Sequence, residues 1–315
     1  MSTFKLFISI IITLFISVVI MNIPGTTNGN ESEDPSLIED DNEEVQIIAS
    51  PETLTPAQKA LWQILPAGGQ PAEERTAQMG AEAIPALAEA LKTENEDYIY
   101  NAAICMAFLP EPLRTDQLVS LLAHDSLDVR SEAVNALGQS YDPSSAGRML
   151  KVLARCEDHA IRGKMALILA KERNPSLSES IQNSRLKETD TEVLHDFDLA
   201  LSRLGNLEAR SRIALQLRNP VPKLRVEAIR DYLYIDDVSS LQDLRSLLFS
   251  VDPLMNTRPA HSGTEVWLRN CDVAAEVIIN VAKLPIASEI KNFGRDPLTD
   301  TQLEKVRAFL YQIAR

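Results

Sequence analysis

The chain has 315 residues, of which 45% are hydrophobic and only 5% aromatic, and it contains just 11 glycines. This balance favours helices packed through Ala, Leu, Ile and Val, and it disfavours a turn-rich all-β design. The formal net charge is -14 at pH 7, which excludes the basic surface that binding to nucleic acid requires.

The first predicted element is an apolar segment, Leu6–Ile23, which follows Lys5 and precedes acidic sequence. A helix of this length suffices to cross a bilayer. No small-x-small cleavage site follows it, so residues 1–23 predict an uncleaved signal anchor, with secretion after signal cleavage as the alternative. Because the positive charge precedes the apolar segment, we expect a single-pass membrane protein with a cytoplasmic amino end and an extracytoplasmic remainder.

Residues 24–54 are expected to form a disordered acidic linker. They carry nine acidic side chains and no Lys or Arg. Low hydrophobicity combined with charge of one sign prevents a segment from burying enough surface to become ordered. We therefore expect a spacer that holds the folded domain away from the membrane.

Helical elements are expected from residue 55 onward. Thr55 followed by Pro56 is typical of an N-cap and first helical position, which predicts an N-terminal capping helix over residues 55–70. Gly80 is expected to end one helix, and Pro85 to lie in the first turn of the next.

A short pattern then recurs at a nearly constant interval: an aliphatic residue, usually followed by a polar one, and an alanine or other apolar residue four positions after the first. It begins at Ile99, Val129, Ile161, Val193 and Leu224, so the intervals are 30, 32, 32 and 31 residues. A fixed period of this length predicts stacked helix pairs rather than one closed core. Such a stack generally provides a binding surface, so the repeat favours an interaction protein over an enzyme.

The pattern resembles the HEAT-like repeat family, including its bacterial branch related to phycobilin lyases. The best-matching segments run from Gly80 to Leu91 and from Asp125 to Gly138. The resemblance covers about residues 70–285, and it implies antiparallel helix pairs that stack into a curved solenoid. We therefore expect an all-α fold, an α-solenoid (superhelix) of about six stacked helix-pair repeats over residues 55–295, preceded by a single transmembrane helix.

One interval departs from the period. The next candidate helix begins near Val273, 49 residues after Leu224, which indicates an insertion within residues 251–270. Insertions in repeat proteins form loops on one face, often the binding face. This one contains side chains typical of interface anchors, namely Arg258, His261, Trp267 and Arg269. It is either a partner-contacting loop or a surface loop whose Trp267 fills the end of the core.

The last predicted element is an amphipathic capping helix within residues 296–315. Its apolar residues recur at helical spacing from Thr299 onward and form one stripe, made of Leu303, Val306, Leu310 and Ile313.

Arg130, Arg162 and Arg225 occupy the same position in three repeats, one residue after the aliphatic residue. The interpretation that we favour is a ladder of Arg–carboxylate hydrogen bonds that link turn to helix and repeat to repeat. The alternative is an anion-binding stripe along the inner wall, although Tyr100 and Leu194 interrupt it.

The sequence predicts no catalytic residue, cofactor or metal. The four histidines lie in different repeats without metal-ligand spacing, and no nucleophile elbow, phosphate loop or dinucleotide motif is present. Cys105, Cys156 and Cys271 also lie in different repeats. Because packed helices lie about 8–10 Å apart, we expect no disulfide within the chain; the cysteines are either small buried apolar residues, or one exposed thiol forms a bridge to another molecule.

The leading functional hypothesis is therefore a non-catalytic, extracytoplasmic scaffold or adaptor that binds a protein or peptide. The second helix of each pair would supply the contacts, with the candidates Tyr98, Tyr100, Asn101, Arg130, Asn135, Lys164, Asp198 and Arg230. One alternative is an exported enzyme or chromophore-lyase-like protein with a pocket near residues 251–270. The other is a structural spacer.

Overall fold

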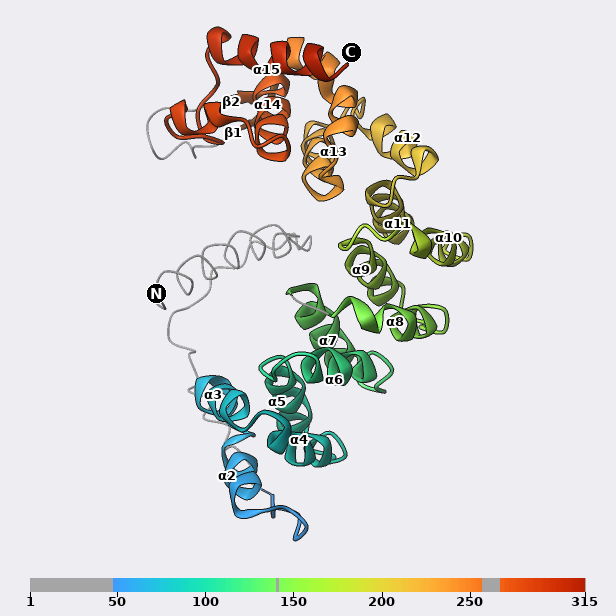
Figure 1. Cartoon of the computed structure of the whole chain (residues 1–315), viewed down its shortest axis with the longest axis vertical. Helices are drawn as coiled ribbons and strands as arrows, with labels where there is room; N and C mark the ends of the chain where they lie inside the picture. Colours follow the sequence, from blue (N-terminus) through green and yellow to red (C-terminus); the bar gives the residue numbers. More distant parts are fainter. Residues whose placement is uncertain (1–47, 140–141, 257–266, 315) are drawn as a thin grey trace, which may run out of the picture. The chain divides into compact units, whose positions relative to one another are not determined.

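A computed structural model describes residues 48–139, 142–256 and 267–314 of the chain (Figure 1). The predicted signal anchor at 1–23 and most of the predicted linker lie outside these residues, as do Arg258 and His261 of the insertion. Within the described residues, no helix combines the length and the apolar character needed to cross a membrane.

The described residues fall into two compact units. One contains residues 48–114 and 135–139, and the other contains 115–134, 142–256 and 267–314. Apart from one two-stranded hairpin in the second unit, the regular elements of the described chain are helices. The predicted all-helical repeat character is thereby confirmed.

The first unit begins with the predicted capping helix. Its helices are α2 (Pro56–Ile64), α3 (Gly69–Met79), η1 (Gly80–Ala83), α4 (Ile84–Ala90) and α5 (Glu96–Met106). Thr55 is the N-cap of α2, and it exchanges hydrogen bonds with Gln58 at 2.9 and 3.4 Å. Gly80 ends α3 with a φ of 54°, a conformation that a residue without Cβ adopts freely. Pro85 lies in the first turn of α4, as predicted.

The last residues of the predicted linker pack against this unit. The carbonyl of Ile48 accepts hydrogen bonds from Trp62 Nε1 at 3.0 Å and from the Tyr98 hydroxyl at 3.5 Å. The rings of Trp62 and Tyr98 pack with their centroids 4.8 Å apart, and Leu54 is buried. Residues 48–54 therefore belong to the folded part of the chain.

Further helix pairs follow α5 along the chain and are labelled in Figure 1. The elements are α6 (Leu113–Leu121), α7 (Leu127–Gln139), η2 (Pro143–Ser145), α8 (Ala146–Leu153), α9 (His159–Ala170), η3 (Pro175–Leu177), α10 (Ser178–Arg185), α11 (Thr191–Arg203), α12 (Leu207–Gln216) and α13 (Pro222–Ile235). The recurring pattern falls inside α5, α7, α9, α11 and α13, which we call the second helices together with α14. Several second helices start at a polar residue just before the pattern. The side chains of Asn95, Asp158 and Asp190 are N-caps, which accept hydrogen bonds from backbone N–H groups in the first turn of their helices.

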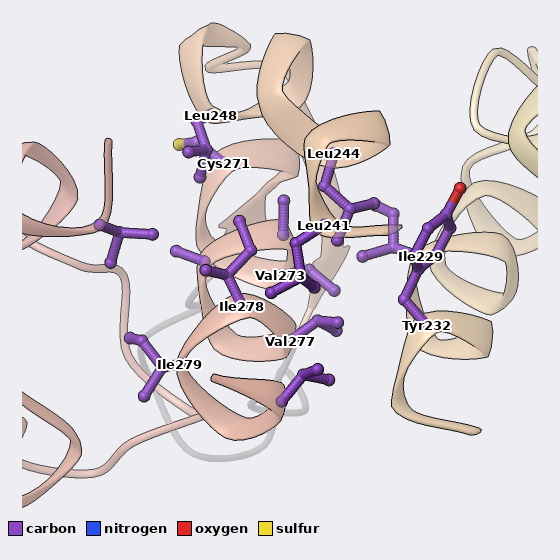
Figure 2. Close-up of a cluster of buried hydrophobic side chains, with 14 of the residues drawn as sticks. Ile229, Tyr232, Leu241, Leu244, Leu248, Cys271, Val273, Val277, Ile278 and Ile279 are labelled. Carbon is purple, nitrogen blue, oxygen red and sulfur yellow. The ribbon is translucent and has the colours of Figure 1, made fainter. Parts of the chain in front are cut away.

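The last repeat differs from the others because its first helix is a 3₁₀ helix, η4 (Val238–Phe249), and its second helix is α14 (Asn270–Val281). Both pack with α13 around an aliphatic core (Figure 2). The labelled side chains of this core include Ile229, Tyr232, Leu241, Leu244, Leu248, Val273, Val277 and Ile278. This core holds the end of the second unit together.

The insertion forms a hairpin, whereas the sequence indicated a loop. Strands β1 (Pro253–Asn256) and β2 (Trp267–Arg269) are antiparallel, with an irregularity after Pro253. Leu254 and Leu268 are buried, whereas Trp267 is 47% exposed. Neighbouring side chains of a strand point to opposite faces, so the strand that buries Leu268 exposes Trp267. The hypothesis that Trp267 fills the end of the core is therefore wrong.

The chain ends with η6 (Pro285–Glu289) and α15 (Asp300–Ile313). Thr299 is the N-cap of α15 in a capping box with Gln302. Leu303, Val306 and Leu310 of the predicted stripe are buried. The cysteines are free, with Cys105 and Cys271 buried and Cys156 half-buried.

Candidate functional site

The three repeated arginines each tie a second helix to the turn before it. Every one donates from Nη1 to the backbone carbonyl six residues earlier. The bonds are Arg130 to His124 at 2.8 Å, Arg162 to Cys156 at 2.7 Å and Arg225 to Asn219 at 2.6 Å. The repeated position therefore has a repeated structural contact.

Each arginine also reaches the start of the following repeat. The partners are Asp158 for Arg130 at 3.8 Å, Glu188 for Arg162 at 2.5 Å and the Asn270 amide oxygen for Arg225 at 3.2 Å. The predicted ladder is confirmed as a structural feature, with an amide instead of a carboxylate at its last step. Its donors are engaged within the protein, which argues against the anion-binding alternative for Arg130.

Glu188 is the most enclosed carboxylate of this ladder, with a side chain that is 0% exposed. It also accepts hydrogen bonds from the N–H groups of Thr189 and Asp190 at 2.8 and 3.0 Å, and it lies 2.6 Å from His159 Nδ1. Burial alone would raise the pKa of Glu188, but the hydrogen bonds from Asp190, Arg162, His159 and Thr189 together lower it to about 2.

Asp198 has a similar structural role. Its carboxylate accepts from Arg185 Nε at 2.5 Å and from Arg212 Nη2 at 2.7 Å, and the residue is 6% exposed. Burial acts to raise the pKa of Asp198, yet the two guanidinium groups hold it below its usual value. The structure thus places this predicted partner contact in the interior, where it joins α10, α11 and α12.

Three further side chains that were predicted to contact a partner instead make contacts within the protein. Tyr98 is buried against Trp62. Asn101 donates to the Pro66 carbonyl at 3.0 Å. Arg269 binds Asp272 at 2.9 Å and donates to the Leu298 carbonyl at 2.9 Å. We therefore do not carry these side chains forward as partner contacts.

The remaining predicted contacts lie at the surface or partly exposed. Tyr100, Asn135 and Arg230 are exposed on α5, α7 and α13, Trp267 is exposed on β2, and Lys164 is half-buried on α9. Lys164 and Arg230, however, stand beside carboxyl groups that the sequence interpretation did not select.

These carboxyl groups belong to a set of titratable and charged side chains on the second helices, which we call the charged row. Most of its members lie three residues after the aliphatic residue of the pattern. The charged row consists of Glu132 on α7, Lys164 on α9, His195 and Asp196 on α11, Arg230 and Asp231 on α13, and Glu276 on α14.

Asp196 is packed directly against the neighbouring second helix. A Cβ at Gly163 of α9 would overlap Oδ2 of Asp196, and Cγ lies 3.2 Å from that position. Only glycine therefore leaves room for this carboxyl group. Burial raises the pKa of Asp196 to about 6, with Asp231 and Glu192 acting in the same direction and His195 and Lys164 opposing them.

His195 joins α11 to α13. Its Nε2 lies 3.1 Å from Oδ2 of Asp231, which is only 15% exposed. That oxygen is buried and receives no hydrogen bond of normal geometry, so the contact is an ion pair rather than a well-formed hydrogen bond. The Asp231 carboxylate raises the pKa of His195, despite the burial of the ring.

Glu132 and Glu276 complete the charged row. Burial raises the pKa of both carboxyl groups, and Lys164 and Arg230 respectively oppose the shift. Oε2 of Glu276 is buried without a hydrogen-bond partner. These carboxyl groups therefore differ from Glu188, because burial outweighs the contacts that would stabilise their charged form.

Neither the charged row nor another described cluster suits a metal. Within the part of the chain that the structure describes, no three His, Cys, Asp or Glu side chains are grouped to hold an ion. A shallow, open hollow on the first unit is lined by Ile48 and residues 94–97, and none of its lining residues belongs to the insertion. What the charged row offers is a partly buried electrostatic surface.

Comparisons with known proteins add a fold likeness only. No family model and no curated protein matches the chain. A solved structure of the complex of CpcE and CpcF of phycocyanin lyase from Nostoc sp. PCC7120 aligns with 85% of this chain and 98% of the matched chain, at 13% identity and a TM-score of 0.43. An engineered protein aligns with 82% of this chain and 75% of its own, at 16% identity and a TM-score of 0.39. Neither similarity assigns an activity to this chain.

Proposed function

We propose that this chain is a non-catalytic scaffold whose charged row binds an extended protein or peptide segment carrying Lys or Arg side chains. The observation that supports it most is the contrast between two sets of carboxylates. Glu188 of the arginine ladder is surrounded by hydrogen bonds from Arg162, Thr189 and Asp190, whereas the carboxylates of the charged row are half-buried and incompletely compensated. Groups perturbed in this way concentrate at functional sites.

The sign of the charge favours a cationic partner. The charged row contains four carboxyl groups against Lys164 and Arg230, and Glu227 adds an exposed carboxylate on α13. Charge complementarity increases the rate of association and selects among partners. A segment with basic side chains is therefore the partner chemistry that this surface fits.

The spacing of the charged row suits an extended segment. Packed helices lie about 8–10 Å apart, and an extended chain advances about 3.3 Å per residue. A partner that crosses the second helices would therefore place a side chain at each repeat with about every third residue. This arrangement is the general use that helical repeats make of their surfaces.

We also propose that residues 1–23 anchor the scaffold, so that the repeats lie outside the cytoplasm. The alternative, an exported enzyme or chromophore-lyase-like protein, needs a convergent polar pocket beside residues 251–270. In the described part of that segment, Leu254 and Leu268 are buried and Arg269 is paired with Asp272. The observations therefore favour the scaffold.

Photo-crosslinking in cells tests the proposed surface. A photoreactive amino acid would replace Glu192 or Glu227, which are exposed on second helices, or Lys151 or Asn183, which are exposed on first helices. We expect a discrete partner to be cross-linked from the first two positions and not from the other two. In a Glu132→Gln background the yield should fall, whereas a Glu208→Gln background should leave it unchanged. Equal cross-linking from both kinds of helix would contradict the proposal.

A further inference from the structure

We propose that the charged row is a pH-sensitive device in which mild acidification cancels its negative charge and releases a cationic partner. This inference rests on the proposed function, because it names the regulation of the same surface. It depends on two contacts between neighbouring second helices, Asp196 against Gly163 and His195 with Asp231.

The first contact places a carboxyl group against the α9 backbone. Since a Cβ at Gly163 would overlap the Asp196 carboxyl oxygen, this oxygen lies directly against the α9 backbone with no room for a further atom between them. A carboxyl group enclosed in this way favours its neutral form. The proton on Asp196 is therefore linked to the packing of α9 against α11.

The second contact replaces a missing step of the arginine ladder. Leu194 stands on α11 where Arg130, Arg162 and Arg225 stand on α7, α9 and α13, so no ladder arginine connects α11 to the next repeat. Besides the bond from Arg203 of α11 to the Tyr234 carbonyl of α13, His195 and Asp231 connect the two helices, at 3.1 Å. At this step, a group that titrates near neutral pH takes the place of a permanently charged one.

Charged and titratable groups from the neighbouring helices surround Asp196 and His195. Lys164 of α9 and Asp231 of α13 act on Asp196 from the neighbouring second helices, and Glu192 acts from α11 itself. His195 is influenced by Asp231, Asp196 and Asp198. The arginines of the flanking first helices are already bound: Arg185 on α10 and Arg212 on α12 by Asp198, and Arg210 on α12 by Asp243.

The change in charge follows from these groups. With its carboxyl groups ionised and His195 neutral, the charged row has four negative and two positive charges, a net charge of -2. Protonation of Asp196 and His195 brings this to zero. The pKa of Asp196 is raised to about 6, so this group gains its proton as the pH falls through about 6. The pKa of His195 is raised above its usual value by the Asp231 carboxylate, so mild acidification protonates this ring as well.

Acidification in this range also strengthens the helix contacts. A group whose pKa is raised by folding contributes stability that is present at low pH and is lost as the pH rises through its folded value. This holds for Asp196 and for His195. The carboxylates of the arginine ladder stay ionised, because the pKa of Glu188 is about 2 and that of Asp198 is also lowered. The surface therefore loses its charge while the stack stays folded.

The first experiment needs no partner. Urea unfolding of the full chain at pH 7.5 and pH 5.5 should give a higher midpoint at pH 5.5. Asp196→Asn should raise the midpoint at pH 7.5 and remove most of the pH dependence, and His195→Gln should remove part of it. Glu227→Gln, a change of an exposed carboxylate on α13, should keep the wild-type difference. If Asp196→Asn and His195→Gln both keep that difference, the device is refuted.

The second experiment measures release. Cross-linking from position 192 would be compared at pH 7.5 and pH 5.5, with the expectation of a several-fold lower yield at pH 5.5. Equal yields, together with the expected unfolding data, would refute release while leaving the binding surface intact. Absence of cross-links at both pH values would refute the proposed function, and release with it, whatever the unfolding data show.

Discussion

Replacing Glu188 with Gln tests whether the arginine ladder holds successive repeats together. Glu188→Gln keeps the size of the side chain but removes the charge that Arg162 and His159 face. Folding lowers the pKa of Glu188 from 4.5 to about 2. At about 1.4 kcal/mol per pKa unit, the charge contributes about 3 kcal/mol to the stability of the protein at neutral pH.

The sign of this contribution sets its pH dependence. A carboxyl group whose pKa is lowered by folding stabilises the protein above its unfolded pKa, and this stabilisation is lost as the pH falls through the folded value. For Glu188 that window lies between about 4.5 and about 2. The effect of Glu188→Gln should therefore be complete at pH 7 and diminish only in strong acid.

Urea unfolding of the full chain, followed by circular dichroism, measures the effect, and Glu208→Gln is the matched control. Glu208 also contacts an arginine, Arg212, at 2.8 Å, but its side chain is 84% exposed. An exposed pair of this kind contributes about 0–1 kcal/mol. We expect a much lower midpoint for Glu188→Gln and almost no change for Glu208→Gln. Equal midpoints for the two variants would refute the structural role of the ladder.

Three further changes follow from packing, and each is measured by thermal or urea unfolding of the full chain. Gly163→Ala places a Cβ against the Asp196 carboxyl group and should lower the free energy of unfolding by about 1–3 kcal/mol. Gly147→Ala is its control: nothing lies within 4 Å of the added atom, so the change should stabilise α8 by up to about 1 kcal/mol. Leu268→Ala should lower the free energy of unfolding by about 2–5 kcal/mol, because this side chain is buried. Trp267→Ala removes a half-exposed side chain, so its effect on the free energy of unfolding should be clearly smaller. Asp198→Ala leaves the Arg185 guanidinium without its carboxylate and Arg212 with Glu208 alone, and it should lower the free energy of unfolding by about 3–5 kcal/mol.

The helical repeat and the ladder could be predicted because their signals are local and periodic. Arg130, Arg162 and Arg225 recur at one position of one pattern, so a single contact explains all three. The turn before each pattern is also polar, which fixes where the helices begin. The last partner, Asn270, was not predicted because it lies beyond the insertion, where the period is broken.

The hairpin could not be predicted from so short a segment. β1 has four residues and β2 has three, too few for alternation to be distinguished from a loop. Trp267 was selected for its chemistry, yet a one-residue difference in strand register decides whether a side chain is buried. Leu268, the residue that fills the core, gave no signal in the sequence.

The charged row was missed for a different reason. Its contacts join residues about one repeat apart, such as His195 and Asp231, and they depend on how far each helix is rotated towards its neighbour. The position of Asp196 could be predicted only if Asp196 and Gly163 were considered together, because the glycine provides the space that the carboxyl group fills. Comparing the third position after each aliphatic residue across the repeats would have shown Glu132, Lys164 and Asp196 in one register.

The two charge systems can coexist because of helix geometry. Ladder residues follow the aliphatic residue by one position and most members of the charged row by three, which separates them by about 200° around a helix of 3.6 residues per turn. On α9, Arg162 and Lys164 therefore serve different surfaces. One system uses guanidinium groups and buried carboxylates that stay charged, so it keeps the stack intact across the physiological pH range. The other uses Asp196 and His195, whose raised pKa values make their charges sensitive to mild acidification, so we expect only the charged row to respond to acid.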